Sequence, residues 1–81
     1  MPYMLVNVYM VINMERTIKL ALASLLESKG ITRYELSKRT NIQYQTIDRY
    51  YKNKVIKYDS YILQKICLAL DCEVGDIIKI I

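Results

Sequence analysis

Helix-boundary signals lie close together in the middle of this 81-residue chain. Gly30 follows a lysine, which is the pattern of a helix end, because the C-terminus of a helix favours a cation and then a residue that tolerates a left-handed backbone. Thr32 stands three residues before Glu35, the spacing of a capping box at a helix start. Asn41 then interrupts the next helix, since asparagine adopts the left-handed conformation more readily than most residues. These signals predict two short helices joined by a tight turn over residues 32–51.

Apolar residues recur at helical spacing on both sides of this segment. Upstream they predict a first helix over residues 18–29, although residues 16–20 suit a strand as well. Downstream they predict a fourth helix over residues 60–70, followed by a short last helix or a turn over residues 73–78. The expected fold class is therefore all-α, with five helices in one domain. The expected core positions are Ile18, Ala21, Leu22, Leu25, Leu26, Leu36, Ile47, Tyr50, Ile62, Leu63, Ile66, Ala69 and Leu70.

Both ends of the chain are apolar and rich in β-forming residues. The first twelve residues read MPYMLVNVYMVI, and the last five read IIKII. Such residues suit extended strands, so residues 6–12 and 77–81 are expected to pair as a small two-stranded β edge, either within one chain or across a dimer. The alternatives are that residues 1–12 are a poorly ordered tail, or that the apolar N-terminal extension, residues 1–14, lies upstream of a natural start at Met10 or Met14. The N-terminal run is too short to span a bilayer and lacks the flanks of a signal peptide.

Neither the composition nor the motifs indicate catalysis. The chain contains no histidine, the commonest general base near neutral pH, and no phosphate-binding loop or nucleophile elbow. Cys67 and Cys72 are too few for a disulfide scaffold, and they cannot complete a zinc site without histidine. We therefore expect a cytoplasmic protein that is not an enzyme, has no cofactor or metal, and has no room for a small-molecule ligand domain.

Positive charge is concentrated in the middle third of the chain. Residues 33–57 carry seven basic and two acidic side chains, whereas the whole chain has a net charge of +4. A polyanion would be bound where such an excess lies. A solvated basic surface gives the same pattern, so the charge by itself does not decide between the two interpretations.

The two central helices meet the physical requirements of a helix-turn-helix. Ser37 is small enough for the second helix to cross the first closely, and Asn41 permits the tight turn. Ile42 provides a hydrophobic pin after the turn. Ile47 is the expected buried anchor of the second helix, which begins near Gln43 and leaves its other faces polar.

The polar positions of this second helix and its surroundings divide into two sets. The N-terminal residues of a recognition helix reach base edges in the major groove, where glutamine can bond to adenine through two hydrogen bonds. The expected base contacts are Gln43, Tyr44, Gln45 and Asp48. Polar residues at helix ends and in the following loop are better placed for phosphates. The expected contacts with the DNA backbone are Arg33, Thr46, Arg49, Lys52, Asn53 and Lys54.

The segment GITRYELSKRTNIQYQTIDRYYKNK resembles the helix-turn-helix core of lambda-repressor- and Cro-like regulators, the XRE family. The stretch YILQKICLALDCEVGDII resembles the fourth and fifth helices of that family, so the resemblance covers residues 18–78. It implies a five-helix lambda-repressor-like domain that binds pseudo-palindromic operators in double-stranded DNA as a dimer, and we expect a repressor. Arg33 stands where many members carry glutamine, which keeps a phosphate contact but loses the glutamine's bracing of the base-reading helix. Asn41 stands where a turn glycine is usual.

Three functions fit these features. The first is a sequence-specific transcriptional regulator, a homodimer whose subunit contacts come from residues 6–12 and 77–81. The second is a protein-interaction module on the same fold, either antitoxin-like or an anti-repressor. The third, association with a membrane surface, is disfavoured because the basic and apolar residues occupy different elements rather than opposite faces of one helix.

Overall fold

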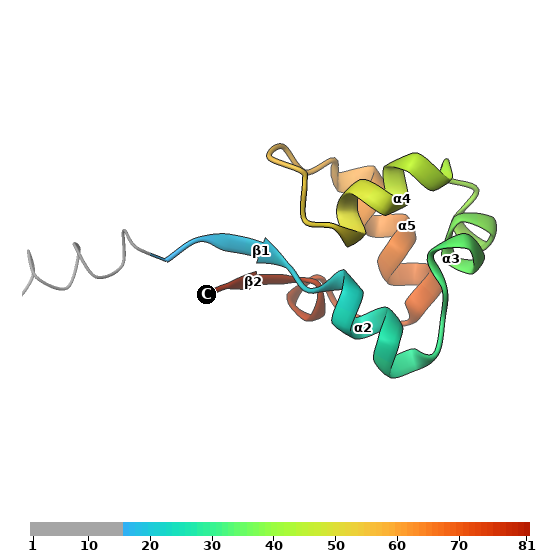
Figure 1. Cartoon of the computed structure of the whole chain (residues 1–81), viewed down its shortest axis with the longest axis horizontal. Coiled ribbons are helices and arrows are strands. Elements are labelled where there is room, and N and C mark those ends of the chain that lie inside the picture. The colour runs from blue at the N-terminus through green and yellow to red at the C-terminus, as the bar shows by residue number, and fades with distance from the viewer. Residues whose placement is uncertain (1–15) are drawn as a thin grey trace, which may run out of the picture.

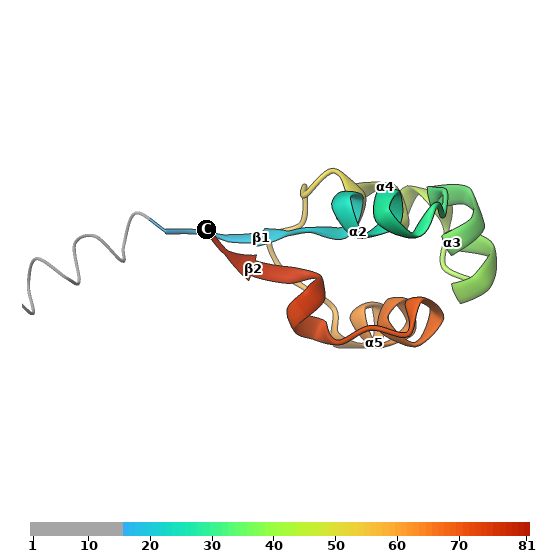
Figure 2. The same ribbon diagram turned by 90° about the horizontal axis from the view of Figure 1, so that it is seen from below.

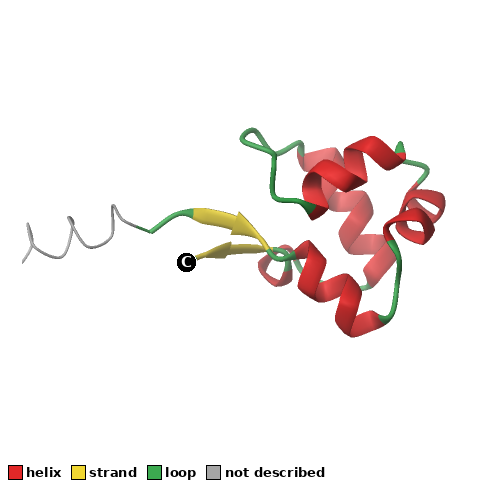
Figure 3. Ribbon diagram, viewed as in Figure 1, coloured by secondary structure: helices red, strands yellow, loops and turns green. Residues whose placement is uncertain are grey.

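The computed structural model describes residues 16–81. The elements follow in the order β1 (Ile18–Leu20), α2 (Leu22–Lys29), α3 (Arg33–Thr40), α4 (Tyr44–Tyr51), α5 (Ser60–Leu70), the 3-10 turn η1 (Val74–Asp76) and β2 (Ile78–Ile80). The helices form one body, and the two strands project from it as a ribbon that includes the C-terminus (Figure 1). Figure 3 shows the same division, with the helical body in red and the ribbon in yellow.

The ends of the central helices follow the local signals in the sequence. Gly30 ends α2 in the left-handed conformation, at φ 66°, and Asn41 ends α3 in the same way, at φ 57°. The backbone N–H of Glu35 donates a hydrogen bond to the Thr32 hydroxyl oxygen at 3.1 Å, so the predicted cap of α3 is confirmed. The Glu35 carboxylate does not complete a capping box but lies 3.4 Å from Arg39 one turn later.

The core lies between two layers of helices. In Figure 2, α2 and α4 lie on one side of the body and α5 on the other, with α3 at the end opposite the ribbon. The fully enclosed side chains are Leu22, Leu26, Leu36, Ile47, Ile66 and Ile77. Most of the predicted core positions are buried in the core or packed against it, but Ile18 is wrong, since 54% of its surface is exposed, and Ala21 is only half-buried and lies outside the core cluster. Leu20 of β1 also belongs to the core, as do Ile42 and Val55, which pack inward from the turn before α4 and from the loop after it.

The ribbon is a two-stranded antiparallel sheet. Its residue pairs are Ile18 with Ile80, Lys19 with Lys79, and Leu20 with Ile78. Because side chains alternate along a strand, the aliphatic residues share one face of the ribbon and the lysines share the other. The buried Leu20 joins the aliphatic face to the core, which explains why the ribbon leaves the body at this point.

The two ends of the described chain correct the expected fold. The partner of the C-terminal strand is β1, whereas residues 6–12, like the whole extension 1–14, lie outside the described residues. Residues 18–20 pair as a strand instead of opening the first helix, which begins only at Leu22. The predicted fifth helix is the short 3-10 turn η1, because the next residue, Ile77, is fully buried and the chain then pairs as β2. Residues 16–81 therefore form four α-helices and a small two-stranded sheet. The mostly helical class and the C-terminal strand of the predicted β edge are confirmed, whereas a fifth α-helix is not.

None of the helices in residues 16–81 has the length and apolar character that crossing a bilayer requires. In the same part of the chain, no cluster of three or more cysteine, aspartate or glutamate side chains could hold a metal ion. Cys67 and Cys72 are both free thiols.

Candidate nucleic-acid interface

The turn between α3 and α4 is fixed by side-chain hydrogen bonds from the end of α3. The Ser37 hydroxyl donates to the Ile42 carbonyl oxygen at 2.5 Å. The buried Thr40 hydroxyl donates to the Leu36 carbonyl oxygen at 2.8 Å and accepts from the Ile42 N–H at 3.3 Å. Ile42 packs into the core as the predicted pin. These hydrogen bonds make the turn rigid. Ser37 was predicted at this position from the sequence, whereas Thr40, which also holds the turn, was not.

The α4 helix presents its N-terminal end to solvent. Ile47 and Tyr50 are its buried residues, so the predicted anchor at Ile47 is confirmed. Gln43, Tyr44 and Gln45, three of the four predicted base contacts, are exposed and lie together at this end. The N-terminal end of α4 thus offers amide and phenol groups on a backbone held by the turn.

Asp48, the fourth predicted base contact, has a different environment. Its Oδ1 lies 2.5 Å from the Arg33 guanidinium Nη1, and its Oδ2 lies 3.1 Å from the Lys52 ammonium. The hydrogen bond from Lys52, and then that from Arg33, hold the pKa of the Asp48 carboxyl below its usual value. Asp48 therefore stays ionised at neutral pH and joins two residues that the sequence predicted as phosphate contacts.

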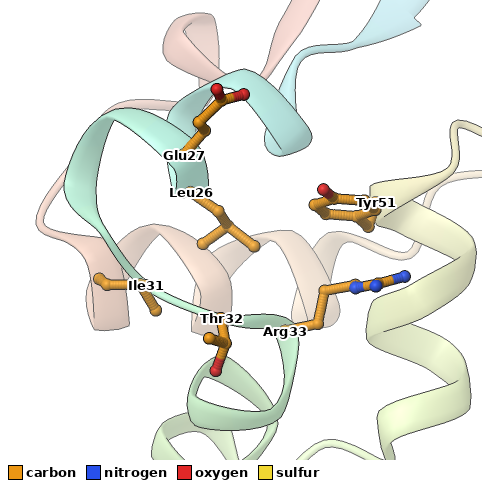
Figure 4. A pocket seen from close by; sticks show the side chains of 6 residues that line it. All are labelled: Leu26, Glu27, Ile31, Thr32, Arg33 and Tyr51. Carbon is orange, nitrogen blue, oxygen red and sulfur yellow. The ribbon is translucent and has the colours of Figure 1, made fainter.

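Arg33 connects the start of α3 to the side of α4. Besides its ion pair with Asp48, the Arg33 guanidinium carbon lies over the Tyr51 ring, 4.4 Å from the ring centroid. It also lies over the Tyr44 ring, at the longer distance of 5.9 Å from that centroid. Figure 4 shows Arg33 beside Tyr51 at a cavity of about 290 Å³, which is also lined by Leu26, Glu27, Ile31 and Thr32. The sequence indicated that arginine at this position loses the bracing that glutamine gives to the second helix. In the structure, the ion pair with Asp48 and the cation–π contact with Tyr51 join Arg33 to α4 by different chemistry.

Residues 21–81 match the family of the Cro/C1-type HTH DNA-binding domain, a range that runs from the start of α2 to the end of the chain and contains the α3–α4 pair. The chain belongs to this family. The family is that of DNA-binding regulators, and the predicted resemblance to lambda-repressor- and Cro-like proteins is confirmed. No curated protein and no solved structure matches the chain.

The loop after α4 of this Cro/C1-type domain is held at several points. The backbone N–H of Leu20 donates to Asn53 Oδ1 at 2.9 Å, and Asn53 has a left-handed backbone at φ 57°. Val55 packs into the core, and the Asp59 N–H donates to the Tyr50 hydroxyl oxygen at 3.0 Å. The Asn53 side-chain oxygen is therefore bound to the Leu20 amide. Its NH2 group is the part left for the predicted contact with the DNA backbone.

The remaining residues predicted to contact the DNA backbone differ in their exposure and in whether their charge is paired. Arg49 and Lys54 are exposed and form no ion pair within residues 16–81. Lys52 is exposed but paired with Asp48, and Thr46 is half-buried on α4. Unpaired positive charge thus lies at the C-terminal end of α4 and in the loop that follows it, next to the exposed polar residues of the helix.

Proposed function

We propose that this Cro/C1-type domain is a cytoplasmic, sequence-specific transcriptional repressor that acts by binding double-stranded DNA, without catalysis and as a single domain. The α4 helix lies in the major groove in this proposal. The observation that carries it is the exposed polar end of α4, held on a rigid turn and followed by unpaired cations. A helix in the major groove needs these features, because base edges are read by polar side chains while phosphates are held by positive charge.

Base recognition in this proposal comes from the N-terminal end of α4. Gln43 and Gln45 each offer an amide that can bond to both N6 and N7 of adenine, and Tyr44 lies between them with 42% of its surface exposed. Contacts with the DNA backbone come from residues around this end and from the following loop. These are Arg33, Thr46, Arg49, Lys52, the NH2 group of Asn53, and Lys54.

We propose further that two copies bind one pseudo-palindromic operator. A single small module makes few phosphate contacts, and paired half-sites about 34 Å apart would let two copies add their affinities. Ile80 and Ile81 at the tip of the ribbon are exposed and suit a subunit contact, whereas Ile77 is fully buried and does not. Analytical ultracentrifugation would measure the homodimer, and duplexes selected from a random pool would show whether half-sites recur at this spacing.

The test of base recognition uses the double variant Gln43→Ala, Gln45→Ala. Its discrimination between the selected site and random duplex should fall by about 1–3 kcal/mol per lost contact, with binding to random duplex retained. Fluorescence anisotropy on both duplexes measures this. Gln64→Ala is the matched control, because Gln64 is an exposed glutamine on α5, away from α4. Equal losses on both duplexes would contradict the assignment of the base contacts.

A salt series tests the proposal as a whole. Binding through several phosphate contacts must weaken steeply as salt rises, because each contact releases counterions from the duplex. Absence of duplex binding even at low salt would reject DNA binding. That result would favour the other interpretation of the sequence, a protein-interaction module of the antitoxin-like or anti-repressor kind.

A further inference from the structure

Asp48 is an unusual residue at this surface. It is the only acidic residue between Glu35 and Asp59, and it lies in the middle of the helix proposed to enter the major groove. A carboxylate so close to DNA phosphates opposes binding by charge repulsion, so its presence calls for a physical explanation.

A direct base contact does not explain Asp48. A carboxylate that reads cytosine must offer an oxygen to the N4 amino group. Both Asp48 oxygens already have cationic partners, Arg33 at 2.5 Å and Lys52 at 3.1 Å, and the side chain is 22% exposed. The Arg33 guanidinium is also held on its flat face by the Tyr51 ring. Each oxygen keeps some acceptor capacity, but a cytosine amino group would have to share that oxygen with a cation that is already bound.

We propose that Asp48 is a positioning and specificity-determining residue, which holds Arg33 against α4 and reduces the positive charge that this face offers to phosphates. The inference rests on the proposed function, since it concerns how the same α4 surface binds DNA. One carboxylate shared by two cations leaves this cluster with one net positive charge. The affinity for duplexes of any sequence is lowered in this way, while the positioning of Arg33 favours the selected site, so the ratio of specific to non-specific affinity rises.

The expected size of the effect follows from counterion release. One additional phosphate contact steepens the dependence of log affinity on log salt by about 0.9. If the affinity at about 1 M salt is unchanged, that slope makes binding at about 0.15 M salt about fivefold tighter. Removing the Asp48 charge should therefore raise the affinity for random duplex by about fivefold. The gain on the selected duplex should be smaller, because Arg33 is no longer held against α4, so the ratio of specific to non-specific affinity should fall.

The experiment compares Asp48→Asn with Glu35→Gln. Both variants remove one negative charge, but Glu35 lies in an exposed pair with Arg39 at 3.4 Å on α3. Anisotropy titrations on random and selected duplexes over a salt series should show the larger gain and the steeper slope only for Asp48→Asn. Equal gains in affinity in the two variants would mean that only the net charge of the protein matters, and would overturn the proposal. A changed preference at one base pair with an unchanged slope would overturn it in favour of a base contact.

A measurement without DNA separates this inference from the proposed function. Side-chain protons of Arg33 that lie over the Tyr51 ring should show upfield NMR shifts from the ring current. These shifts should shrink in Asp48→Asn and be largely restored in Asp48→Glu, which keeps the charge. If the chemical shifts of the Arg33 protons stay the same in Asp48→Asn, Asp48 does not position Arg33, even if the wild-type protein binds DNA as proposed. If instead the wild type binds no duplex while the shifts respond as expected, the proposed function and the specificity role of Asp48 fail together, and only the positioning of Arg33 by Asp48 stands.

Discussion

Replacing Asn53 by alanine should destabilise the domain by about 2 kcal/mol. The Asn53 side-chain oxygen accepts a hydrogen bond from the backbone N–H of Leu20 at 2.9 Å, and the residue has a left-handed backbone at φ 57°. Loss of the acceptor leaves a part-buried amide of β1 without its partner, which costs about 1 kcal/mol. Alanine in the left-handed conformation adds about 1 kcal/mol, because its Cβ crowds the following carbonyl oxygen.

Two further variants separate these contributions. Asn53→Asp keeps both an acceptor oxygen and a tolerance for the left-handed backbone, so its stability should stay within about 0.5 kcal/mol of the wild type. Asn53→Gly fits the backbone but lacks the acceptor and is more flexible when unfolded, so it should fall between the other two. Urea and thermal unfolding followed by circular dichroism measure the order, and about 2 kcal/mol corresponds to a Tm lower by roughly 8–16 °C.

The result that refutes this reasoning is an Asn53→Ala variant as stable as Asn53→Asp. The hydrogen bond to Leu20 would then contribute nothing to stability. If the same alanine variant bound duplex DNA more weakly while its Tm stayed unchanged, Asn53 would act only as the contact with the DNA backbone that the sequence predicted. Stability and DNA affinity are thus to be measured on the same set of variants.

Ile47→Ala should cost about 2–5 kcal/mol in urea unfolding, because it opens a cavity under α4. Ile56→Ala, at a position 95% exposed, should change stability by less than about 0.5 kcal/mol, and similar losses in both would contradict the assigned core. Burial, and then the neighbouring Cys67, raise the pKa of the Cys72 thiol from 9.0 to about 11. Cys72 should therefore react slowly with iodoacetamide at about pH 8, and rapid alkylation of the folded protein would argue against this. Because the unfolded thiol ionises first, Cys72 should also lower stability as the pH rises from 9.0 towards 11, and Cys72→Ser should remove that loss.

Local sequence signals are enough to predict where the central helices begin and end. Gly30, Thr32 and Asn41 act on backbone groups within a few residues of themselves, so their effects depend little on the rest of the fold. The predicted segment 32–51 accordingly contains α3, the turn and α4 as the structure has them. The buried anchor Ile47 was equally predictable, because helical periodicity fixes which face of a short amphipathic helix packs inward.

The ends of the domain and the partners of the site residues were decided only by the tertiary structure. The apolar residues of β1 suited either a helix or a strand, and pairing with β2, some sixty residues later, selected the strand. The ion pair of Arg33 with Asp48 and the hydrogen bond of Leu20 with Asn53 join residues 15 and 33 positions apart. Such contacts form only when packing of the core brings two elements together. Sequence patterns therefore predicted which surface is proposed to bind DNA, while the fold decided which polar side chains of that surface are already paired within residues 16–81.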